Sequence, residues 1–471
     1  MPALILLCTA QFMVILDITV VNVALPTIQA DLGIAVEDLQ WVITAYTVAF
    51  GGLLLLGGRA ADLLGRRSVF LAGLAVFTAA SLAAALAESS TTLLAARAAQ
   101  GVGAALLSPA ALSLVTTIFP DGPDRRRALA AWAAVAASGG AFGVLAGGVI
   151  TETLDWPAVF LINVPVGIAA ALAAPRLLPA ARPTTRERGV DLAGAALVTA
   201  SLATLIYALV EAPAAGWGST QTVGLLVAAG AGLAAFVAVE ANVARPLVQL
   251  GVFRRRPTVV AVVLMVAGMG TVLSAFFFLT LYLQQVLGHT ALETGLQFLP
   301  GALVLVATAH AGGHLVGRHG AKPVLVAGMA LGGTGALLLS RIDADGAYLS
   351  DVLPGLLVLD AGIGLAAAGI FITALAGVGE REAGLVSGLV TTAHELGAAI
   401  VLPVLSTIAV AGIGAATLDT ASALDPAVAT AAFGDAFTAA AAIAFGAAAL
   451  ALVALRSGDV APGTAPAMAH H

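Results

Sequence analysis

Charged side chains are scarce in this sequence of 471 residues. Aspartate, glutamate, lysine and arginine together make up 10% of the chain, against about 25% in soluble globular domains. Hydrophobic residues make up 60%, and the mean hydropathy is +1.04. This composition excludes an ordinary soluble fold, and the net charge of −6 disfavours nucleic acid as a partner. The apolar residues are enough for roughly a dozen helices that each cross a lipid bilayer.

Several chemical groups are also missing. Cys8 is the only cysteine, so no disulfide forms within the chain. Lys322 is the only lysine and precedes Pro323, so the glycine-lysine loop that binds the phosphates of ATP is absent. His310 and His314 have the spacing of two metal ligands on a helix, but no third ligand accompanies them. The sequence also lacks a nucleophile elbow and a dinucleotide-binding loop, so we expect no enzyme, no cofactor and no metal site.

Apolar runs separated by charged or Pro/Gly-rich breaks predict fourteen membrane-spanning helices. They lie near residues 3–28, 39–57, 69–87, 93–118, 128–150, 159–178, 192–210, 222–241, 258–286, 295–316, 323–340, 351–378, 384–411 and 434–455. With the N-terminus in the cytoplasm, every lysine and arginine except Arg97 and Arg341 falls on the cytoplasmic side, as the positive-inside rule requires. We therefore expect an all-α integral membrane protein with fourteen transmembrane helices and both termini in the cytoplasm.

Two loops of similar sequence indicate an internal repeat. Residues 58–67 read Gly-x-x-x-Asp-x-x-Gly-Arg-Arg after the second span, and residues 313–322 read Gly-x-x-x-Gly-Arg-x-Gly-x-Lys after the tenth. Chance similarity between two Gly/Arg-rich loops is the alternative. If the loops correspond, the chain consists of an N-terminal six-helix bundle (1–178), two inserted transmembrane helices (191–241) and a C-terminal six-helix bundle (257–456).

A few ionisable residues lie inside the predicted spans, where each costs about 2.5–3.5 kcal/mol unless it is paired or in contact with water. Asp17 lies midway along the first span, and Asn22 follows in the same helix. At about 100° per residue the two side chains point about 140° apart, so we expect them to contact different neighbours. Asp17 has two interpretations, a functional carboxylate beside a cavity or a structural polar contact between helices.

Arg97 places a permanent cation inside the fourth span. Together with Gln100, Gly101, Ala104 and Ser108 it forms a stripe of polar and small residues along one helix face. Its guanidinium group is therefore expected to face protein or water rather than lipid. It either tunes the charge of a carboxylate or ties helices together, and the sequence favours neither.

Two further acidic residues lie in late spans, Asp360 in the twelfth and Glu395 in the thirteenth, beside His394. If they face the same cavity, they would exchange protons or neutralise a cationic substrate. The alternative is that each is a buried carboxylic acid that keeps its proton.

Five motifs in order along the chain resemble those of the major facilitator superfamily, specifically its branch of fourteen-span drug:proton antiporters. They are the acidic sequence of the first span, the loop after the second span, Arg-x-x-Gln-Gly-x-Gly in the fourth span, Trp-Pro-x-x-Phe-x-Ile-Asn-x-Pro-x-Gly at the start of the sixth, and Tyr-Leu-Gln-Gln-Val-Leu-Gly at the end of the ninth (residues 16–26, 58–67, 97–103, 156–167 and 282–288). The likeness covers nearly the whole chain. It implies two helical bundles that rock against each other during transport.

The residues and the resemblance together give candidate roles. We expect proton coupling or substrate binding at Asp17, Asn22, Arg97, Asp360 and Glu395, a gating loop with Gly58, Asp62, Gly65, Arg66 and Arg67, and a helix-packing motif in the fifth span with Gly143, Gly147 and Gly148. The chain departs from the resemblance at Val144, which replaces the usual proline of that span. Loss of a proline kink alters how the helix closes a cavity, and this makes uptake an alternative to export.

We therefore expect a proton-coupled secondary transporter that exports small amphipathic drugs or antibiotics by alternating access, with Asp17 as the leading proton-binding residue and the gating loop as a cytoplasmic latch between the bundles. The alternative is a proton symporter or facilitator for uptake of a small metabolite. A receptor or an intramembrane enzyme would need a sensor domain or a convergent catalytic set, and neither is visible. The expected partners are a small-molecule substrate, protons and lipid, and the chain is expected to be a monomer in a bacterial cytoplasmic membrane.

Overall fold

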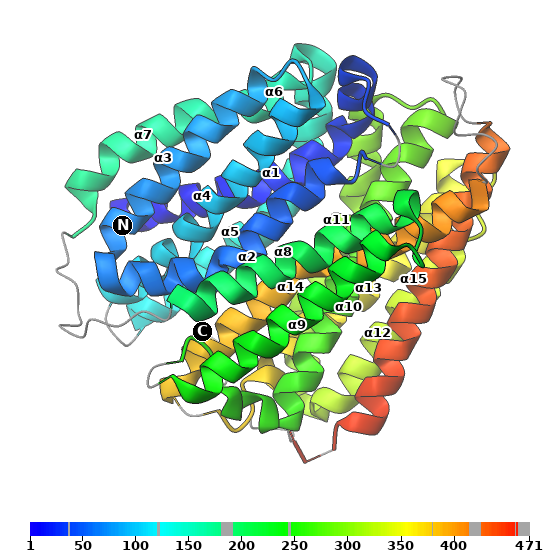
Figure 1. Cartoon of the computed structure of the whole chain (residues 1–471). Helices are drawn as coiled ribbons and strands as arrows, with labels where there is room; N and C mark the ends of the chain where they lie inside the picture. Colours follow the sequence, from blue (N-terminus) through cyan, green and yellow to red (C-terminus); the bar gives the residue numbers. More distant parts are fainter. Residues whose placement is uncertain are drawn as a thin grey trace. The chain divides into compact units, whose positions relative to one another are not determined.

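The computed structural model describes residues 1–35, 38–119, 123–179, 192–243, 246–378, 380–413, 425–456 and 458–459. Within these ranges every regular element is a helix and no β-strand occurs (Figure 1). The all-α part of the prediction is therefore confirmed.

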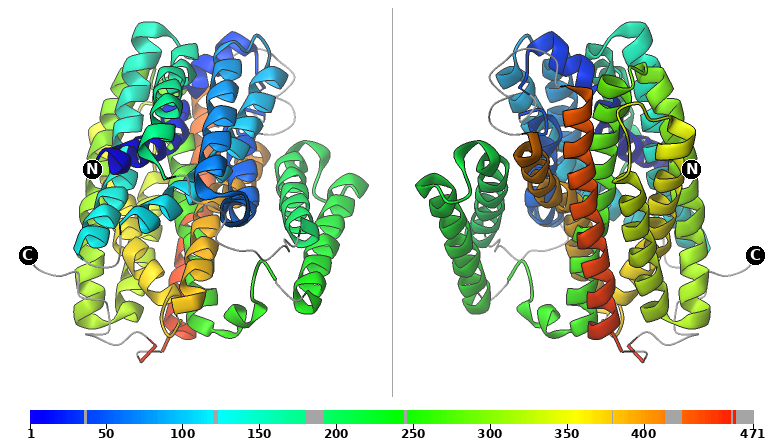
Figure 2. Two further views of the ribbon diagram at one scale, coloured as in Figure 1. Left: turned by 90° about the vertical axis from the view of Figure 1, so that its left-hand side faces the viewer. Right: turned by 90° about the vertical axis from the view of Figure 1, so that its right-hand side faces the viewer.

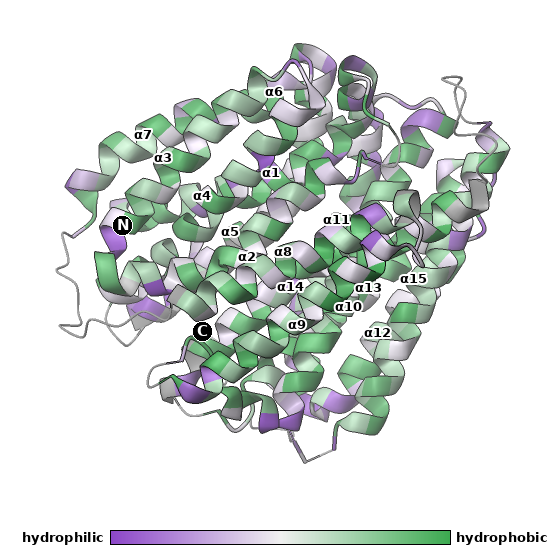
Figure 3. Ribbon diagram, viewed as in Figure 1, coloured by the Kyte–Doolittle hydropathy of each residue, from purple (hydrophilic) through white to green (hydrophobic). Residues whose placement is uncertain are grey.

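Twelve helices in the described part of the chain are long and apolar enough to cross a membrane. Figure 3 shows apolar residues along the lengths of the helices, with hydrophilic residues gathered mainly near the helix ends. Two more helices, α2 (Trp41–Leu64) and α5 (Pro123–Leu154), contain the shorter apolar segments Trp41–Leu54 and Phe142–Leu154. These are the helices of a multi-pass membrane protein, whereas the count of fourteen spans is not confirmed and stays a prediction.

The chain divides into two compact units. Unit 1 consists of Met1–Tyr207, Gly224–Leu247 and Thr290–Leu296, and unit 2 consists of Ala208–Val223, Val248–His289 and Gln297–His471. The helices that begin in unit 1 are α1 (Pro2–Leu32), α2, α3 (Arg66–Ala85), α4 (Ser90–Ile118), α5, α6 (Pro157–Leu161), α7 (Asn163–Leu177) and α8 (Leu192–Ala215), and most of α9 (Thr220–Asn242) also belongs to it. The domain bounds expected from the sequence, 1–178, 191–241 and 257–456, stay a prediction.

Helix α5 packs along α1 through a row of glycines. Gly139, Gly143 and Gly147 recur every four residues, so they lie on one face of α5. A Cβ at Gly143 would collide with the hydroxyl of Thr19, and one at Gly147 would lie 2.8 Å from the carbonyl oxygen of Val20. The absence of side chains at these positions brings the two helices into backbone contact.

Helix α4 is held between α2 and α3 in the same way. Pro109 lies inside α4 and has no N–H, so it cannot donate a hydrogen bond to the carbonyl of Ala105. That carbonyl points at Gly57 of α2, where a Cβ would collide with it. On the other side, a Cβ at Gly73 of α3 would lie 2.8 Å from the carbonyl oxygen of Gly103. Both contacts depend on glycine.

Helices α8 and α9 form an antiparallel pair, and both views of Figure 2 show them side by side. Gly232 of α9 leaves no room for a Cβ beside the hydroxyl of Ser201 in α8. The part of α8 in unit 1 also contacts α2, where the Thr199 hydroxyl donates to the carbonyl oxygen of Gly52 at 2.9 Å. Both helices are long and apolar enough to cross a membrane. That they form a pair inserted between two bundles stays a prediction.

Unit 2 repeats the helix pairings of unit 1. It contains η1 (Leu250–Arg254), α10 (Arg256–Leu281), η2 (Tyr282–Val286), all but the first turns of α11 (Ala291–His319), α12 (Ala321–Leu339), η3 (Tyr348–Val352), α13 (Leu353–Ala374), α14 (Glu380–Ile413) and α15 (Pro426–Ala454). Helix α10 packs on α14 as α1 packs on α5, α12 packs on α13 as α3 packs on α4, and α12 packs on α15 as α3 packs on α7.

The two loops of similar sequence occupy equivalent places in these pairings. The helices before and after each loop extend into it until a single residue is left, which is Gly65 between α2 and α3 and Gly320 between α11 and α12. Their φ angles are 93° and 80°, which glycine adopts without the strain that a side chain would cause. The expectation of a loop over residues 58–67 is therefore wrong in its extent, because one glycine completes the turn.

Candidate functional site

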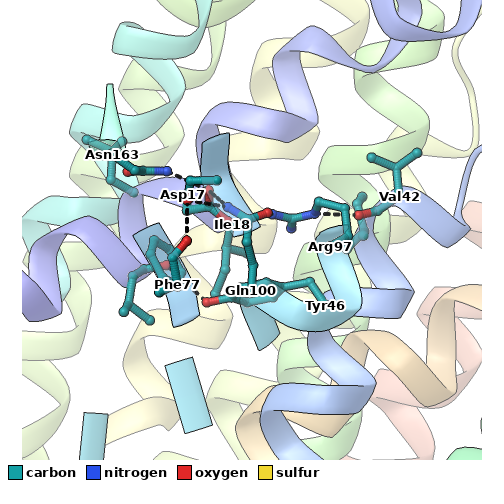
Figure 4. A network of polar contacts seen from close by, with 12 residues as sticks. Asp17, Ile18, Val42, Tyr46, Phe77, Arg97, Gln100 and Asn163 are labelled. Atoms are coloured by element: carbon teal, nitrogen blue, oxygen red, sulfur yellow. Dashed lines mark hydrogen bonds and ion pairs between the residues drawn. The ribbon is translucent and has the colours of Figure 1, made fainter. Parts of the chain in front are cut away.

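A network of polar side chains surrounds Asp17 of α1 inside unit 1 (Figure 4). The Asp17 side chain is fully buried and accepts three hydrogen bonds. Its Oδ2 accepts from Nη1 of Arg97 at 2.5 Å, and its Oδ1 accepts from Nε2 of Gln100 at 3.0 Å and from Nδ2 of Asn163 at 2.8 Å. Both oxygens have partners, so the carboxylate is satisfied by protein alone.

The Arg97 side chain is as deeply buried as its partner, with 1% of its surface exposed. Besides the bond to Asp17, it donates from Nε to the carbonyl oxygen of Val42 in α2 and from Nη1 to Oε1 of Gln100, both at 2.9 Å. Its Cζ lies 4.5 Å from the centre of the Tyr46 ring, within the range of a cation–π contact. As predicted, the guanidinium group faces protein rather than lipid.

Gln100 extends the network to α3. Its Nε2 donates to Oγ of Ser81 at 2.8 Å as well as to Asp17, which uses both hydrogens of the amide. The Ser81 hydroxyl in turn donates to the carbonyl oxygen of Phe77 at 2.8 Å. Helices α1, α2, α3, α4 and α7 thus meet around one carboxylate.

The local sequence explains why these side chains converge. Arg97 and Gln100 are three residues apart in α4 and therefore lie on one face. Gly101 follows them, and a Cβ there would collide with the backbone of α2. Asn163 is the first residue of α7, which is separate from α6 because Pro165 has no N–H for the carbonyl four residues earlier. The side chain of Asn163 is therefore presented at a helix start.

A buried ion pair of this kind can act as a switch. Burying either ion alone costs several kcal/mol, and the attraction between them offsets this cost only while the geometry holds. A proton on Asp17 would cancel the negative charge and leave Arg97 without a counter-ion. The two charges therefore depend on each other, and the loss of one leaves the other buried without its partner.

The structure brings together two of the five residues expected to couple protons or bind substrate, Asp17 and Arg97. Asn22 is not part of their network. Its Nδ2 donates to the carbonyl oxygen of Ile18 at 3.4 Å, and its Oδ1 has no hydrogen-bond partner among the described residues. As predicted, Asp17 and Asn22 contact different neighbours.

The other two expected residues lie in unit 2. Asp360 of α13 is fully buried, and neither of its carboxyl oxygens has a hydrogen-bond partner in the described part of the chain. Glu395 of α14 has its Oε1 3.1 Å from Nδ1 of the adjacent His394. No hydrogen bond within the described ranges joins Asp360 to Glu395, so direct proton exchange between the two acids has no support.

The expected gating residues lie at the turn between α2 and α3. Arg66 donates to the Thr117 hydroxyl of α4, and Arg67 donates to the carbonyl oxygen of Leu178 at 3.2 Å. The side chain of Asp62 lies outside the described residues. The contacts of the two arginines tie the turn to the ends of α4 and α7 within unit 1, and a role as a latch between bundles stays a prediction.

The three expected packing glycines of α5 are all in close contact with other helices. Gly143 and Gly147 face α1, as described above, and Gly148 faces the first turn of α11, which belongs to unit 1. A Cβ at Gly148 would lie 2.7 Å from the carbonyl oxygen of Ala291. Helix α5 runs without a break through Val144, where the resemblance leads one to expect a proline.

Sequence reasoning missed Asn163 and Ser81 as parts of the site and Gly57 as a contact point. The first two are uncharged, so their burial costs less than that of a charged group and does not mark them as clearly in a sequence. The position of Asn163 within the Trp-Pro motif was the available signal. Gly58, next to Gly57, was named only as part of the gating loop, and a Cβ at Gly58 would lie an ordinary 3.8 Å from Pro109.

Comparison with known proteins identifies the family. The sequence pattern of the Major Facilitator Superfamily matches residues 7–402. The chain belongs to this superfamily. It is 43% identical over 424 residues to the cephamycin export protein CmcT of Amycolatopsis lactamdurans. The matched region covers 89% of this chain and 87% of that protein. It is 40% identical over 421 residues to the puromycin resistance protein pur8 of Streptomyces alboniger, with 88% and 83% covered.

The superfamily fold is also present in solved structures. The crystal structure of the POT family transporter PepTSo matches with a TM-score of 0.68 over 96% of this chain and 97% of that one, at 15% identity. At this identity the likeness concerns the fold alone. The predicted superfamily membership and its helical membrane fold are thus confirmed, and the Asp17 network lies within the first unit of a superfamily protein.

Proposed function

We propose that this superfamily member is a proton-coupled exporter of a small amphipathic antibiotic and has no enzymatic activity. The relatives described above are named for the export of a cephamycin and for resistance to puromycin, and each matches this chain over most of its length. The buried ion pair of Asp17 and Arg97 carries the proposal of proton coupling, because it joins a titratable group to a permanent charge inside membrane helices.

We further propose that the chain crosses the membrane fourteen times, with α2 and α5 added to the twelve candidate spans and with α8 and α9 as the inserted pair. Both termini lie in the cytoplasm in this proposal, and the relatives support a bacterial cytoplasmic membrane. The transporter works as a monomer, needs no cofactor and uses the proton gradient as its source of energy.

The coupling mechanism gives Asp17 two states. In the conformation described here its carboxylate is paired with Arg97. In the other state a proton from the outer side binds to a carboxylate oxygen, the pair separates, and α1 shifts relative to α4. Release of that proton to the cytoplasm restores the pair. Because substrate leaves outward in the same cycle, the entry of a proton is tied to the exit of a drug molecule.

One proton per cycle supplies enough free energy for useful export. A proton that enters through a potential of about 100 mV contributes about 2.3 kcal/mol, and a difference of about one pH unit contributes about 1.4 kcal/mol more. At about 1.4 kcal/mol per factor of ten, the two together support a concentration ratio on the order of several hundred.

Inside-out membrane vesicles test this proposal, because an exporter in them moves its substrate into the vesicle. Vesicles from cells that express the chain receive an acidic interior and ethidium, a cephamycin or puromycin. We expect gradient-dependent accumulation of at least one compound, and we expect a protonophore to abolish it. Asp17→Asn should remain in the membrane but lose the accumulation. Gly224→Ala is the control, since a Cβ at this position of α9 has no atom within 4 Å.

Each other outcome overturns part of the proposal. Gradient-driven movement of these compounds out of the vesicle would replace export by uptake, the alternative that the sequence leaves open. Equal levels with and without the chain, at every gradient, would exclude transport of these compounds. Undiminished accumulation by Asp17→Asn would remove Asp17 from the coupling mechanism and leave export intact.

A further inference from the structure

Asp360 is a second buried acidic residue, and its surroundings in unit 2 differ from those of Asp17 in unit 1. The Asp360 side chain has no exposed surface, and neither oxygen has a hydrogen-bond partner among the described residues. Opposite it on α11 lies Gly301, where a Cβ would collide with Oδ2 of Asp360. The carboxyl group therefore occupies space that any other side chain at this position of α11 would fill.

Asp360 is enclosed by helices on both sides of α13. Leu356 and Gly364 lie one turn before and one turn after it on the same face, and both contact α11. The preceding residue, Leu359, faces α12, where a Cβ at Gly335 would collide with its backbone nitrogen. The carboxyl group is therefore held inside the protein, away from lipid.

The repeat relates Gly301 to a residue of the Asp17 network. The turns at Gly65 and Gly320 are equivalent. Tyr46 precedes the first turn by the same number of residues as Gly301 precedes the second, so Tyr46 and Gly301 are equivalent positions. Tyr46 is the residue whose ring covers the guanidinium group of Arg97. Glycine thus occupies in α11 the position of this large aromatic residue in α2.

Asp360 is related in the same way to Gly101 of α4. Gly103 of α4 faces Gly73 of α3, and Gly362 of α13 faces Gly328 of α12. In both pairs a Cβ on the second glycine would lie 2.8 Å from the carbonyl oxygen of the first, so Gly103 and Gly362 are equivalent. Gly101 precedes Gly103 by the same number of residues as Asp360 precedes Gly362. In unit 1 the larger residue, Tyr46, is on α2 and the glycine, Gly101, is on α4. In unit 2 the glycine, Gly301, is on α11 and the larger residue, Asp360, is on α13.

No charged neighbour compensates Asp360 within the described ranges. The titratable residues of the elements packed against α13 are Arg256 in α10, Glu293, His310, His314, Arg318 and His319 in α11, Lys322 in α12, Glu380, Arg381, Glu382, His394 and Glu395 in α14, and Tyr348 and Asp351 in η3. None of those with described side chains donates a hydrogen bond to Asp360. An ionised carboxylate buried without a partner costs several kcal/mol, so this group carries a proton in the present conformation.

We propose that Asp360 is a second proton-carrying residue of the transport cycle and that Gly301 keeps open the space for its carboxyl group, an inference that rests on the proposed proton coupling. A proton from water on the outer side forms an O–H bond with a carboxylate oxygen of Asp360 in one state. In the other state this O–H bond breaks and the proton passes to water on the cytoplasmic side. No other covalent bond changes.

Infrared difference spectroscopy of the purified full-length protein detects the proton on the Asp360 carboxyl group without any transported substrate. A protonated carboxyl group has its own carbonyl band, which disappears when the proton is lost as the pH is raised. We expect such a band in the wild type and in Gly317→Ala, and we expect Asp360→Asn to lack it. Gly317 is the matched control, because it lies in α11 like Gly301 but has no atom within 4 Å of an added Cβ. Identical spectra for the wild type and Asp360→Asn would overturn the proposal.

Ethidium accumulation in proteoliposomes measures how much the proton on Asp360 contributes to the driving force of transport. With a difference of about one pH unit and no membrane potential, each coupled proton contributes a factor of about ten to the steady-state concentration ratio. We expect Asp360→Asn to lower this ratio about tenfold and Gly317→Ala to leave it unchanged. An undiminished ratio would overturn the role of Asp360.

Gly301→Ala tests the role of the glycine in the same assay. The added methyl group should displace the carboxyl group of Asp360, lower the concentration ratio and shift its infrared band, whereas Gly317→Ala should do neither. A wild-type ratio and band for Gly301→Ala would remove Gly301 from the mechanism. If ethidium is not transported by any form of the protein, the proposed export fails for this compound, and the infrared spectra alone decide the role of Asp360.

Discussion

Removing both charges of the Asp17–Arg97 pair should destabilise the protein less than removing either one. Asp17→Asn leaves the guanidinium group buried without a counter-ion, and Arg97→Gln leaves the carboxylate with only the amide donors of Gln100 and Asn163. The side chains of Asp17 and Arg97 are 0% and 1% exposed, so water cannot replace the lost partner. The double variant carries two uncharged amides, which can hydrogen-bond to each other and to the same neighbours.

The expected magnitudes follow from the burial of the pair. Breaking a buried ion pair by removing one partner costs about 3–5 kcal/mol, whereas replacing both ions by uncharged groups is close to neutral. Each single variant should therefore lose about 3 kcal/mol or more of unfolding free energy, and the double variant should return to within about 1–2 kcal/mol of the wild type. The effects of the two substitutions are then strongly non-additive.

Heating of the detergent-solubilised proteins, followed by the loss of the monodisperse peak in size-exclusion chromatography, gives the order of stabilities. Accumulation in inside-out vesicles gives transport for the same four proteins. We expect the double variant to regain stability but not transport, because it has no carboxyl group to carry a proton. Recovery of both would show that the pair is a structural tie alone. A double variant destabilised by the sum of the two single effects would refute the reasoning that the ions act as a unit.

Three further predictions concern the packing of unit 1, and melting temperature in detergent checks each of them. Gly57→Ala should cost about 1–3 kcal/mol through its collision with the carbonyl of α4, while Gly58→Ala in the next position should be close to neutral; equal effects would contradict the contact. Trp156→Phe should cost about 1 kcal/mol, since it removes the hydrogen bond from Nε1 to Asp31, and Asp31→Asn, which can still accept it, should cost less. Gly65→Ala should cost about 1 kcal/mol because of the φ angle of 93°, and an unchanged melting temperature would show that the turn tolerates a side chain.

The sequence was informative where the bilayer makes a residue costly. Asp17, Arg97 and Asp360 stand out because a charged group in a lipid-embedded helix requires a local explanation. All three are buried in the structure, and two of them form an ion pair. The helices themselves were predicted from apolar runs, because length and composition decide which segments enter a membrane.

The partners of these residues could not be predicted from the sequence. Asp17 and Asn163 are far apart along the chain, and nothing in either helix alone indicates that an amide will complete the site. The lone burial of Asp360 depends on Gly301 in another helix, and a glycine in a sequence rich in glycine carries no signal of its own. Helix ends were also misjudged at Gly65, because a single residue with positive φ replaces a loop.

The roles proposed for the two buried acids predict the number of protons transported per cycle. If Asp17 and Asp360 each carry one proton, a difference of about one pH unit supports a steady-state ratio of about a hundred, and a single carrier supports about ten. The two variants should differ in exchange at equal pH. Asp17→Asn leaves Arg97 without a counter-ion and should slow exchange as well, whereas Asp360→Asn leaves no unpaired charge and should slow it less. A wild-type ratio near ten that Asp360→Asn leaves unchanged and Asp17→Asn abolishes would assign the only coupled proton to Asp17 and reduce Asp360 to a packing residue.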